Sequence, residues 1–458
     1  MEYLVRFSQW HETFRLAELQ ALAQVAGIEM QVLSYSDESP FCLVKLPSED
    51  AARTILQRSI LAQSIHEHWG TADTYDELHA IVKRETSHLW PRYHDVSFKI
   101  NIDTFYGARS AKKKLELINS FSYLPLEGRI LLSSPDQEFT IFEQWEFGAV
   151  PKNLPNPIKV HFGRLIGTGV RELVRKYDLK KRGYISTTSM DSELALITAN
   201  IACAAPGKLF YDPFVGTGSF PIACAHFGAL GFGSDIDGRS VRGEGGNKSL
   251  KGNFAQYGLE NCLGDVFVCD LTNTPVRRMR FLDGIVCDPP YGVREGLRVL
   301  GCRDPEKDAW VVEKGKQSYK LANFVPPKKP YSFVAMLDDI LNFATDTLVD
   351  GGRLSFWMPT ANDEEQDIPV PTHPSLEVVV VCVQAFNKWS RRLITYRRIP
   401  DAEVDQVALA ARTQALVNGY TADDLNPFRR NYFRGFRPEE GVTAAGEVTN
   451  TSALPRTD

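Results

Sequence analysis

Residues Leu209–Ser219 read LFYDPFVGTGS, and this stretch carries the clearest sign of the fold. A short apolar run, Leu209–Tyr211, ends at Asp212, and the helix-like segment Phe220–His226 follows directly after the stretch. Gly216 and Gly218 therefore lie at a turn from a strand into a helix, where the lack of side chains lets a cofactor approach the backbone. The stretch predicts an α/β unit with a cofactor site at its turn.

The spacing of the glycines argues against two classes of nucleotide. Position 221 holds Pro221 where a dinucleotide fingerprint has its third glycine, and no G-x-x-x-x-G-K-[ST] motif occurs in the chain. NAD and nucleoside triphosphates are therefore disfavoured as ligands. A lone G-x-G also forms plain tight turns, so the neighbouring strands must indicate whether this one holds a cofactor.

Strand-like runs alternate with helical stretches on both sides of this turn. After Leu209–Tyr211 they are Gly231–Ser234, Val266–Val268, Gly284–Cys287 and Arg353–Met358, with two closing strands at Leu376–Ala385 and Leu393–Arg397. This alternation predicts a doubly wound, seven-stranded, Rossmann-like α/β sheet. In such a sheet ligands bind beyond the carboxyl ends of the strands, at the point where the strand order reverses.

Acidic residues follow the next two strands. Asp235 comes directly after Gly231–Ser234 and can accept both ribose hydroxyls of a nucleoside, while Asp270 can accept from an adenine amino group with Ile236 packing on the ring. Each acid alone is more often a solvated strand end than a ligand contact. Their succession at neighbouring strand ends favours a nucleoside site.

The next strand runs into a doubled proline, Asp288-Pro289-Pro290-Tyr291. Two prolines fix two φ angles and remove two N–H donors, so the loop is stiff and presents the Asp288 carboxylate and the Pro289 carbonyl as acceptors beside the Tyr291 ring. Acceptors of this kind can hold both N–H groups of an aromatic amine in the tetrahedral geometry needed for attack. The alternative is a rigid turn without chemistry.

These motifs resemble the class I S-adenosylmethionine-dependent methyltransferases, in which D-P-P-Y is the amino-methylating variant of the fourth motif. A longer set resembles the THUMP-containing family of eukaryotic tRNA (guanine-10-N2)-methyltransferase catalytic subunits and extends over most of residues 1–400. Its segments are Ser120–Gly128, Thr187–Asp191, Asp212–Ser219, Ser234–Asp237, Asp288–Gly296 and Pro326–Ser332.

The resemblance implies transfer of a methyl group from S-adenosylmethionine to the N2 amine of a guanosine, at position 10 of tRNA. It also implies a heterodimer with a small zinc-binding activator protein, with the zinc in that partner. Eight cysteines without any C-x-x-C pair predict reduced thiols and no metal in this chain.

The resemblance also assigns roles to residues. It places the methionine moiety at Asp212 and Gly216, ribose at Asp235, adenine at Ile236 and Asp270, the target amine at Asp288 and Pro289, and the flipped guanine on Tyr291. The predicted catalytic residues are Asp288, Pro289, Pro290 and Tyr291. The predicted cofactor-binding residues are Asp212, Phe214, Gly216, Gly218, Asp235, Ile236, Asp270 and Thr188. Thr188–Asp191 fits a capping box at a helix start equally well.

The N-terminal part has an open α/β pattern. Strand-like Tyr3–Phe7 and Phe41–Leu46 alternate with helix-like Thr13–Ala26 and Glu49–Arg58, and a second block holds strands at Val96–Asp103, Ile130–Leu132 and Phe139–Trp145 with a helix at Ala111–Ser120. With the resemblance, the predicted domains are a ferredoxin-like domain (1–94), a THUMP module (95–168), a linker (169–183), a methyltransferase domain (184–437) and a disordered tail (438–458). Gly292–Tyr331 is expected to form a long loop at the active face.

Two basic segments are candidate RNA contacts. Lys112, Lys113 and Lys114 lie in the second block, and Arg429, Arg430 and Arg434 belong to Leu425–Pro438, which interleaves arginines with aromatic residues. The alternatives are a solvated helix face for the lysines, and aromatic docking on the core with solvated arginines for the second segment.

Composition sets the remaining bounds. The 458 residues contain 57 acidic and 52 basic side chains, a net charge of −5, which argues against a histone-like polycation. With 43% hydrophobic residues the chain can bury large cores. The apolar run Val378–Val383 is far too short to span a bilayer, and Met1–Arg6 does not resemble a secretory signal, so no membrane contact and a cytoplasmic location are expected.

Two other functions stay open at this point. The D-P-P-Y loop recognises an amine more clearly than a base, which leaves an adenine or cytosine amino-methyltransferase acting on another nucleic acid. A non-catalytic RNA-binding scaffold is the second alternative.

Overall fold

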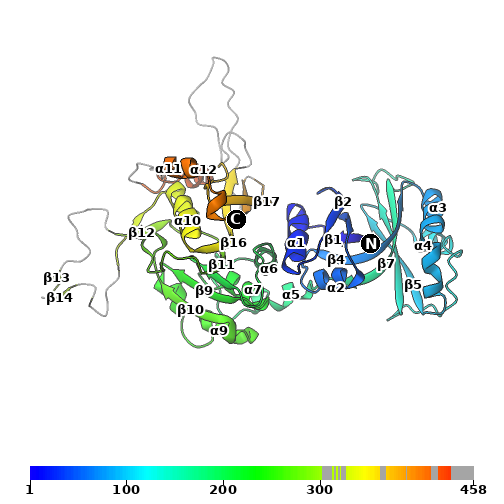
Figure 1. The fold of residues 1–458 in the computed structure, drawn as a ribbon, viewed down its shortest axis with the longest axis horizontal. Coiled ribbons are helices and arrows are strands. Elements are labelled where there is room, and N and C mark those ends of the chain that lie inside the picture. The colour runs from blue at the N-terminus through cyan, green and yellow to red at the C-terminus, as the bar shows by residue number, and fades with distance from the viewer. Residues whose placement is uncertain are drawn as a thin grey trace, which may run out of the picture.

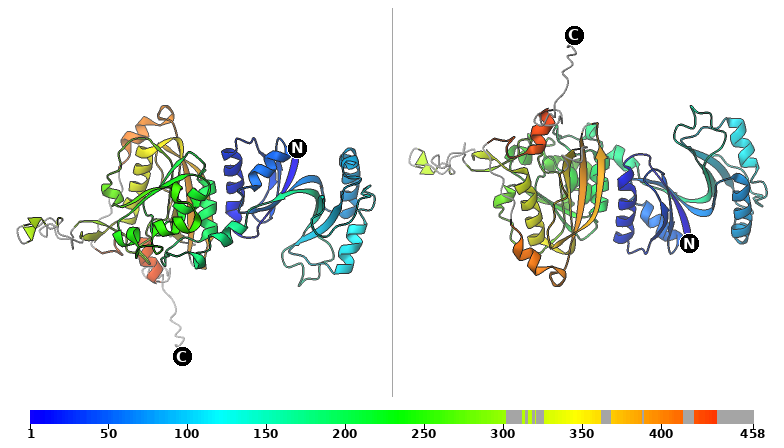
Figure 2. Two further views of the ribbon diagram at one scale, coloured as in Figure 1. Left: turned by 90° about the horizontal axis from the view of Figure 1, so that it is seen from below. Right: turned by 90° about the horizontal axis from the view of Figure 1, so that it is seen from above.

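The computed structural model describes residues 1–301, 312–313, 316–317, 320, 326–361, 368–387, 389–413 and 421–434. Two seven-stranded sheets, one in each half of the chain, form its framework. Helix α1 (Glu12–Val25) lies between the two halves (Figure 1), and both views in Figure 2 agree. None of the described helices is long and apolar enough to cross a bilayer.

The N-terminal sheet is continuous across both predicted N-terminal domains. Its order is β2 (Gln31–Tyr35), β3 (Phe41–Lys45), β1 (Glu2–Phe7), β4 (Ala62–Ala72), β7 (Lys159–Thr168), β6 (Gln137–Gln144) and β5 (Phe98–Phe105). Its helices are α2 (Glu49–Leu56), α3 (Tyr75–Thr86) and α4 (Ala111–Asn119). The antiparallel pairing of β4 with β7 joins residues 1–94 to residues 95–168. The domain boundaries themselves stay predictions.

Most of the expected N-terminal elements are confirmed, and one is wrong. Ile130–Leu132 forms no strand; Ile130 makes only an isolated bridge to Phe98, and Leu132 is 81% exposed. Three consecutive apolar residues suggested a buried strand, but their sequence alone does not show whether neighbouring segments cover them. The long β4 escapes prediction because its middle, His66-Glu67-His68, places polar residues at consecutive positions and breaks the alternation.

The C-terminal sheet confirms the doubly wound fold. Its order is β10 (Leu263–Val268), β9 (Leu230–Asp235), β8 (Leu209–Asp212), β11 (Leu282–Cys287), β16 (Leu348–Ala361), β18 (Trp389–Arg398) and β17 (Leu376–Ala385). The first five strands pair in parallel, and β18 is antiparallel to both of its neighbours. The chain leaves β8 toward β9 and returns at β11, so the strand order reverses between β8 and β11.

Most of the remaining elements lie in the C-terminal half of the chain, and η1 follows α3 in the N-terminal half. The helices are α5 (Glu172–Lys176), α6 (Ser192–Ile201), α7 (Ser219–His226), α8 (Gly238–Arg242), α9 (Leu250–Tyr257), α10 (Phe333–Thr347), α11 (Gln406–Ala411) and α12 (Pro427–Arg434). The short 3-10 turns are η1 (Ser87–Tyr93), η2 (Leu179–Lys181), η3 (Glu260–Cys262), η4 (Leu271–Asn273) and η7 (Asp401–Glu403).

The segment Gly292–Tyr331, expected to be a loop, contains β12 (Arg298–Leu300) paired with β15 (Lys328–Pro330), and β13 (Val312–Glu313) paired with β14 (Lys316–Gln317). Other parts of that segment, and the whole predicted tail 438–458, lie outside the described residues.

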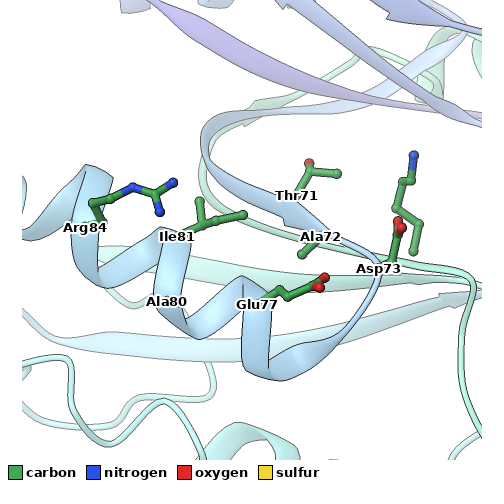
Figure 3. A pocket seen from close by; sticks show the side chains of 8 residues that line it. Thr71, Ala72, Asp73, Glu77, Ala80, Ile81 and Arg84 are labelled. Carbon is green, nitrogen blue, oxygen red and sulfur yellow. The ribbon is translucent and has the colours of Figure 1, made fainter.

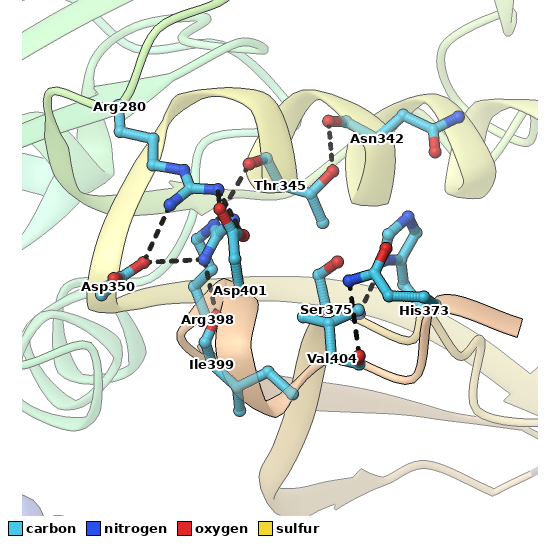
Figure 4. Close-up of polar contacts among 11 residues, drawn as sticks. Arg280, Asn342, Thr345, Asp350, His373, Ser375, Arg398, Ile399, Asp401 and Val404 are labelled. Atoms are coloured by element: carbon cyan, nitrogen blue, oxygen red, sulfur yellow. Dashed lines mark hydrogen bonds and ion pairs between the residues drawn. The ribbon is translucent and has the colours of Figure 1, made fainter. Parts of the chain in front are cut away.

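A buried arginine at the end of β18 connects this strand to its neighbours. Arg398 is 2% exposed and donates to Asp350 at 2.8 Å, to Asp401 at 2.7 Å and to the Thr345 carbonyl at 3.2 Å (Figure 4). Arg280 shares both acids. The network joins β18 to the end of α10 and the start of β16, so its role is to stabilise the sheet.

A buried carboxylate joins the two halves of the chain. Glu18 of α1 is fully buried and accepts hydrogen bonds from the Ser59 hydroxyl, from the backbone N–H groups of Ile60 and Leu61, and from the Asn200 amide of α6 at 2.8 Å. Desolvation raises the pKa of Glu18, and these donors oppose that rise. Asn200 is therefore the partner of Glu18 from across the interface.

Asn200→Ala is expected to lower the free energy of unfolding by about 2 kcal/mol, because it removes a buried donor from a buried carboxyl group. Urea unfolding of the full chain measures the change. Asn119→Ala, at the exposed end of α4, is the control and should leave the midpoint unchanged. Equal midpoints for both variants would contradict the role given to Asn200.

Candidate active site

A pocket of about 920 Å³ opens where the strand order reverses. Eleven of the twelve predicted catalytic and cofactor-binding residues line it: Thr188, Asp212, Phe214, Gly216, Asp235, Ile236, Asp270, Asp288, Pro289, Pro290 and Tyr291. Gly218 is the exception. It lies at the start of α7 with φ +87°, and an added Cβ would lie 3.0 Å from Leu250, so it serves the turn itself.

The glycine turn and the end of β9 form one hydrogen-bonded unit. Asp235 accepts the Gly216 N–H at 3.0 Å with one carboxylate oxygen and the Asp237 N–H at 2.8 Å with the other. Each oxygen keeps a further lone pair for a ligand hydroxyl. Burial raises the pKa of Asp235. The position of a Cβ on Gly216 meets only the Phe214 carbonyl, at 3.9 Å, which leaves this backbone open to a ligand.

Two further acids line this half of the pocket. Asp212 is 2% exposed and accepts the Phe214 N–H at 2.9 Å; burial raises its pKa well above the ordinary value. Asp270 accepts from the backbone N–H and hydroxyl of Thr272 and from the Leu300 N–H at 2.7 Å. Asp270 thus joins the end of β10 to β12.

The structure forms a different helix start from the capping box expected at Thr188–Asp191. Asp191 itself is the N-cap of α6 and accepts the N–H of Glu193 at 2.9 Å. Thr188 donates to Glu295 at 2.6 Å, a residue that also lines the pocket. Ser189 contacts the hydroxyl of Thr217 in the glycine turn at 2.7 Å.

The D-P-P-Y loop follows β11 directly. The Tyr291 hydroxyl donates to Oδ1 of Asp288, and the Arg391 guanidinium lies 4.0 Å from Oδ2. Burial raises the pKa of Asp288 to about 6, while Arg391 and the tyrosine hydroxyl oppose the rise. Asp288 and Tyr291 are therefore coupled before any substrate binds, which the predicted stacking role of Tyr291 did not include.

An aromatic cluster at the other end of the pocket was not predicted. Phe386 and Trp389 stack with ring centroids 4.7 Å apart, and Phe428 and Tyr432 of α12 lie 5.8 and 6.1 Å from Trp389. All four line the pocket together with Arg391. The strand topology could have indicated Trp389 and Arg391. An antiparallel strand places its first residues beside the carboxyl ends of its parallel neighbours, and these two residues begin β18.

The predicted RNA-contact residues lie in two separate places. Lys112, Lys113 and Lys114 form the first turn of α4, at the far end of the molecule from α12 (Figure 1). Arg429, Arg430 and Arg434 belong to α12. Phe428 is 5% exposed, so at least this aromatic residue docks on the core. The Arg429 guanidinium donates to the Gly292 carbonyl at 2.5 Å.

A second cavity, of about 500 Å³, lies in the N-terminal half beside α3 (Figure 3). Its charged residues are Asp73, Glu77, Arg84 and Lys159, two acids and two bases. This mixture gives the cavity no dominant charge. Among the described residues, no group of three or more His, Cys, Asp or Glu side chains is placed to hold a metal ion.

Comparison with known proteins matches both halves of the chain. The family model described as Tmrp11 THUMP N-terminal domain matches residues 1–171, and that described as RMKL-like, methyltransferase domain matches residues 180–298. Among solved structures, TrmN from Thermus thermophilus aligns with a TM-score of 0.40 and 14% identity, over 87% of this chain and 100% of that one.

Curated relatives match over nearly the whole chain. The tRNA (guanine(10)-N(2))-methyltransferase of Saccharomyces cerevisiae is 42% identical, covering 86% of this chain and 92% of the relative. The Homo sapiens tRNA (guanine(10)-N(2))-methyltransferase TRMT11 is 36% identical, covering 94% of this chain and 95% of the relative. On this identity and coverage, the chain belongs to the tRNA (guanine(10)-N(2))-methyltransferase family.

Proposed function

We propose that this chain transfers a methyl group from S-adenosylmethionine to the exocyclic N2 amine of guanosine 10 in tRNA. The observation that carries the proposal is the Asp288-Pro289 acceptor pair in the same pocket as the glycine turn and Asp235. The names of the relatives support guanosine 10 of tRNA as the target. The THUMP family match over residues 1–171 supports an RNA substrate.

The residues of the pocket fit S-adenosylmethionine. Asp235 has free lone pairs for ribose hydroxyls, Ile236 offers an apolar surface for adenine, and the open backbone at Gly216 suits the methionine moiety. When bound, S-adenosylmethionine supplies an electrophilic methyl group on a sulfonium.

The D-P-P-Y loop prepares the nucleophile. The Asp288 carboxylate and the Pro289 carbonyl accept hydrogen bonds from the two N–H groups of the guanine amine. This reduces the delocalisation of the nitrogen lone pair into the ring, so the lone pair can attack the methyl group. The pKa of about 6 at Asp288 suits this carboxylate to take the proton that the nitrogen loses after transfer. Extruding the guanosine from its stack costs a few kcal/mol, which contacts with the Tyr291 ring can offset.

The raised pKa of Asp288 predicts a pH dependence. Only the ionised carboxylate accepts from both the amine and Tyr291, so activity should fall as the pH drops through about 6. The rate of a single turnover at pH 5 should be about a tenth of that at pH 7, because about a tenth of the carboxyl groups remain ionised. Circular dichroism at each pH controls for unfolding. A flat profile between pH 5 and 7 would show that Asp288 ionisation does not govern transfer.

We further propose that a small zinc-binding activator protein forms a heterodimer with this chain, as the family resemblance implies. Co-expression with that partner should raise the yield of folded protein and the rate of methyl transfer. Full activity from the isolated, monomeric chain would contradict this part of the proposal.

The reaction is tested by incubating the co-expressed protein with unmodified tRNA transcript and methyl-labelled S-adenosylmethionine, followed by digestion to nucleosides. Label in N2-methylguanosine is expected. Label in adenosine or cytidine would keep the chemistry and overturn the base. Absence of saturable S-adenosylmethionine binding would instead favour a non-catalytic RNA-binding scaffold.

A further inference from the structure

Two residues at the start of α12 donate hydrogen bonds to the backbone next to the D-P-P-Y loop. Asn426 donates through Nδ2 to the Tyr291 carbonyl at 2.8 Å, and Arg429 donates through Nη1 to the Gly292 carbonyl at 2.5 Å. Both acceptors belong to the residues that follow Pro290. The matched methyltransferase family model ends at residue 298, so this contact comes from beyond it.

The orientation of the Asn426 amide is fixed by its surroundings. The side chain is 2% exposed, and its Oδ1 accepts the Arg429 N–H at 3.0 Å, capping the first turn of α12. A flipped amide would set a donor against this N–H and an acceptor against the Tyr291 carbonyl. One side chain therefore caps α12 and clamps the loop, and the fit is tight: a Cβ on Gly292 would lie 2.8 Å from Nδ2.

Arg429 is also held in place on its own side. Its Nε lies 2.8 Å from Asp423, and its guanidinium stacks over the Phe433 ring at 4.7 Å. The Leu425 carbonyl accepts the Phe333 N–H at 3.1 Å, which attaches the segment to the start of α10. Asn426 and Arg429, which together we call the clamp, therefore belong to a segment that is itself fixed by contacts with the rest of the chain.

We propose that Asn426 and Arg429 are positioning residues for methyl transfer, which fix the direction of the Asp288 and Pro289 acceptors through the carbonyls of Tyr291 and Gly292. This inference rests on the proposed function. The two prolines fix the loop from within, and the clamp fixes the point where it turns at Gly292, whose φ is +77°. Arg429 is accordingly assigned to the loop rather than to an RNA phosphate.

Asn426→Ser tests the clamp, because serine still caps a helix but has no amide donor to reach the Tyr291 carbonyl. The second variant is Arg429→Gln. For each we expect a single-turnover rate at saturating tRNA and S-adenosylmethionine about 10- to 100-fold below wild type, since misplacing reacting groups by about 1 Å costs up to about 100-fold. The KM for tRNA and the Kd for S-adenosylmethionine should stay within about twofold.

Asp405→Ala is the matched control, since Asp405 caps α11 through the N–H groups of Val407 and Ala408 and does not line the pocket. It should keep the wild-type rate although it loses a helix cap outright, which Asn426→Ser does not. The double variant Asn426→Ser/Arg429→Gln should be slower by less than the product of the single effects, because both side chains hold one loop.

Hydrogen exchange of the peptide covering residues 288–296 gives a readout independent of activity. Faster exchange in both clamp variants, and not in Asp405→Ala, is the expected result. Wild-type rates in the clamp variants would overturn the inference, as would a raised KM for tRNA with an unchanged rate, which would return Arg429 to RNA binding. If the wild-type protein methylates no tRNA, the proposed function fails, while the exchange measurement still tests the clamp.

Discussion

Asp288→Ala is expected to slow methyl transfer by about 100- to 1,000-fold, the loss typical when a preorganised electrostatic contact to the reacting group is removed. The Asp288 carboxylate is the side-chain acceptor at the end of β11, and its removal also frees the Tyr291 hydroxyl. Single-turnover assays measure the rate. The Kd for S-adenosylmethionine, measured by calorimetry, should change by less than about threefold, because Asp235 and the glycine turn are untouched.

The control for this variant is Asp346→Ala, which removes a surface acid paired with Arg278. It should keep the wild-type rate. A wild-type rate in Asp288→Ala would contradict the assigned role of the carboxylate.

The same residue should carry a cost in stability. Burial raises the pKa of Asp288 from 3.8 to about 6, so ionising this carboxyl group in the folded protein costs free energy. The cost is absent below the unfolded pKa, and the corresponding stability is lost as the pH rises through about 6. Asp288→Asn should therefore stabilise the inactive protein by about 3 kcal/mol at pH 7.5 and by much less at pH 4.5. Urea unfolding at the two pH values measures the difference.

Asp235→Ala is expected to raise the Kd for S-adenosylmethionine by about 100-fold or more. Two charge-assisted hydrogen bonds to ribose hydroxyls contribute about 3 kcal/mol or more, which corresponds to that factor. The variant also frees the N–H groups of Gly216 and Asp237 and so loosens the glycine turn. Calorimetric titration with S-adenosylmethionine measures the affinity without requiring turnover.

Asp265→Ala is the matched control, since Asp265 is an exposed acid of β10 that pairs with Lys251. It should bind S-adenosylmethionine with wild-type affinity. Equal affinity for Asp235→Ala and Asp265→Ala would remove Asp235 from the cofactor site.

The sequence predicted the part of the pocket around Gly216 because most of its residues, unlike Thr188, follow a parallel strand. Asp212, Asp235 and Asp270 come at the ends of β8, β9 and β10, and parallel strands bring their carboxyl ends to one edge of the sheet. Strand periodicity and turn residues were sufficient to find these ends. The boundaries differ from the structure by a few residues, as expected where strands fray into loops.

The opposite end of the pocket depends on tertiary structure that local patterns do not encode. Trp389 and Arg391 begin an antiparallel strand, so they do not follow a strand as the predicted acids do. Asn426 and Arg429 approach the D-P-P-Y loop across more than 130 positions of the chain. The arginine–aromatic pattern around them suggested RNA, whereas the structure uses Phe428 and Arg429 for contacts within the chain.

The N-terminal half shows the same limit. β4 mixes buried and half-buried polar residues, and His66 and Glu67 are both buried there, so hydrophobic alternation is absent from the strand that joins the sheet together. The apolar Ile130–Leu132 stays exposed. Burial in these places is decided by neighbours distant in sequence.

The most direct test of the central claim replaces guanosine 10 of the tRNA transcript with inosine, which differs from guanosine only in lacking the exocyclic N2 amine. Methyl transfer from labelled S-adenosylmethionine is measured with both transcripts and the co-expressed protein. We expect label in the guanosine transcript, recovered as N2-methylguanosine, and none in the inosine transcript. Equal labelling of both would show that the methyl group goes to another atom, and would contradict N2 methylation of guanosine 10.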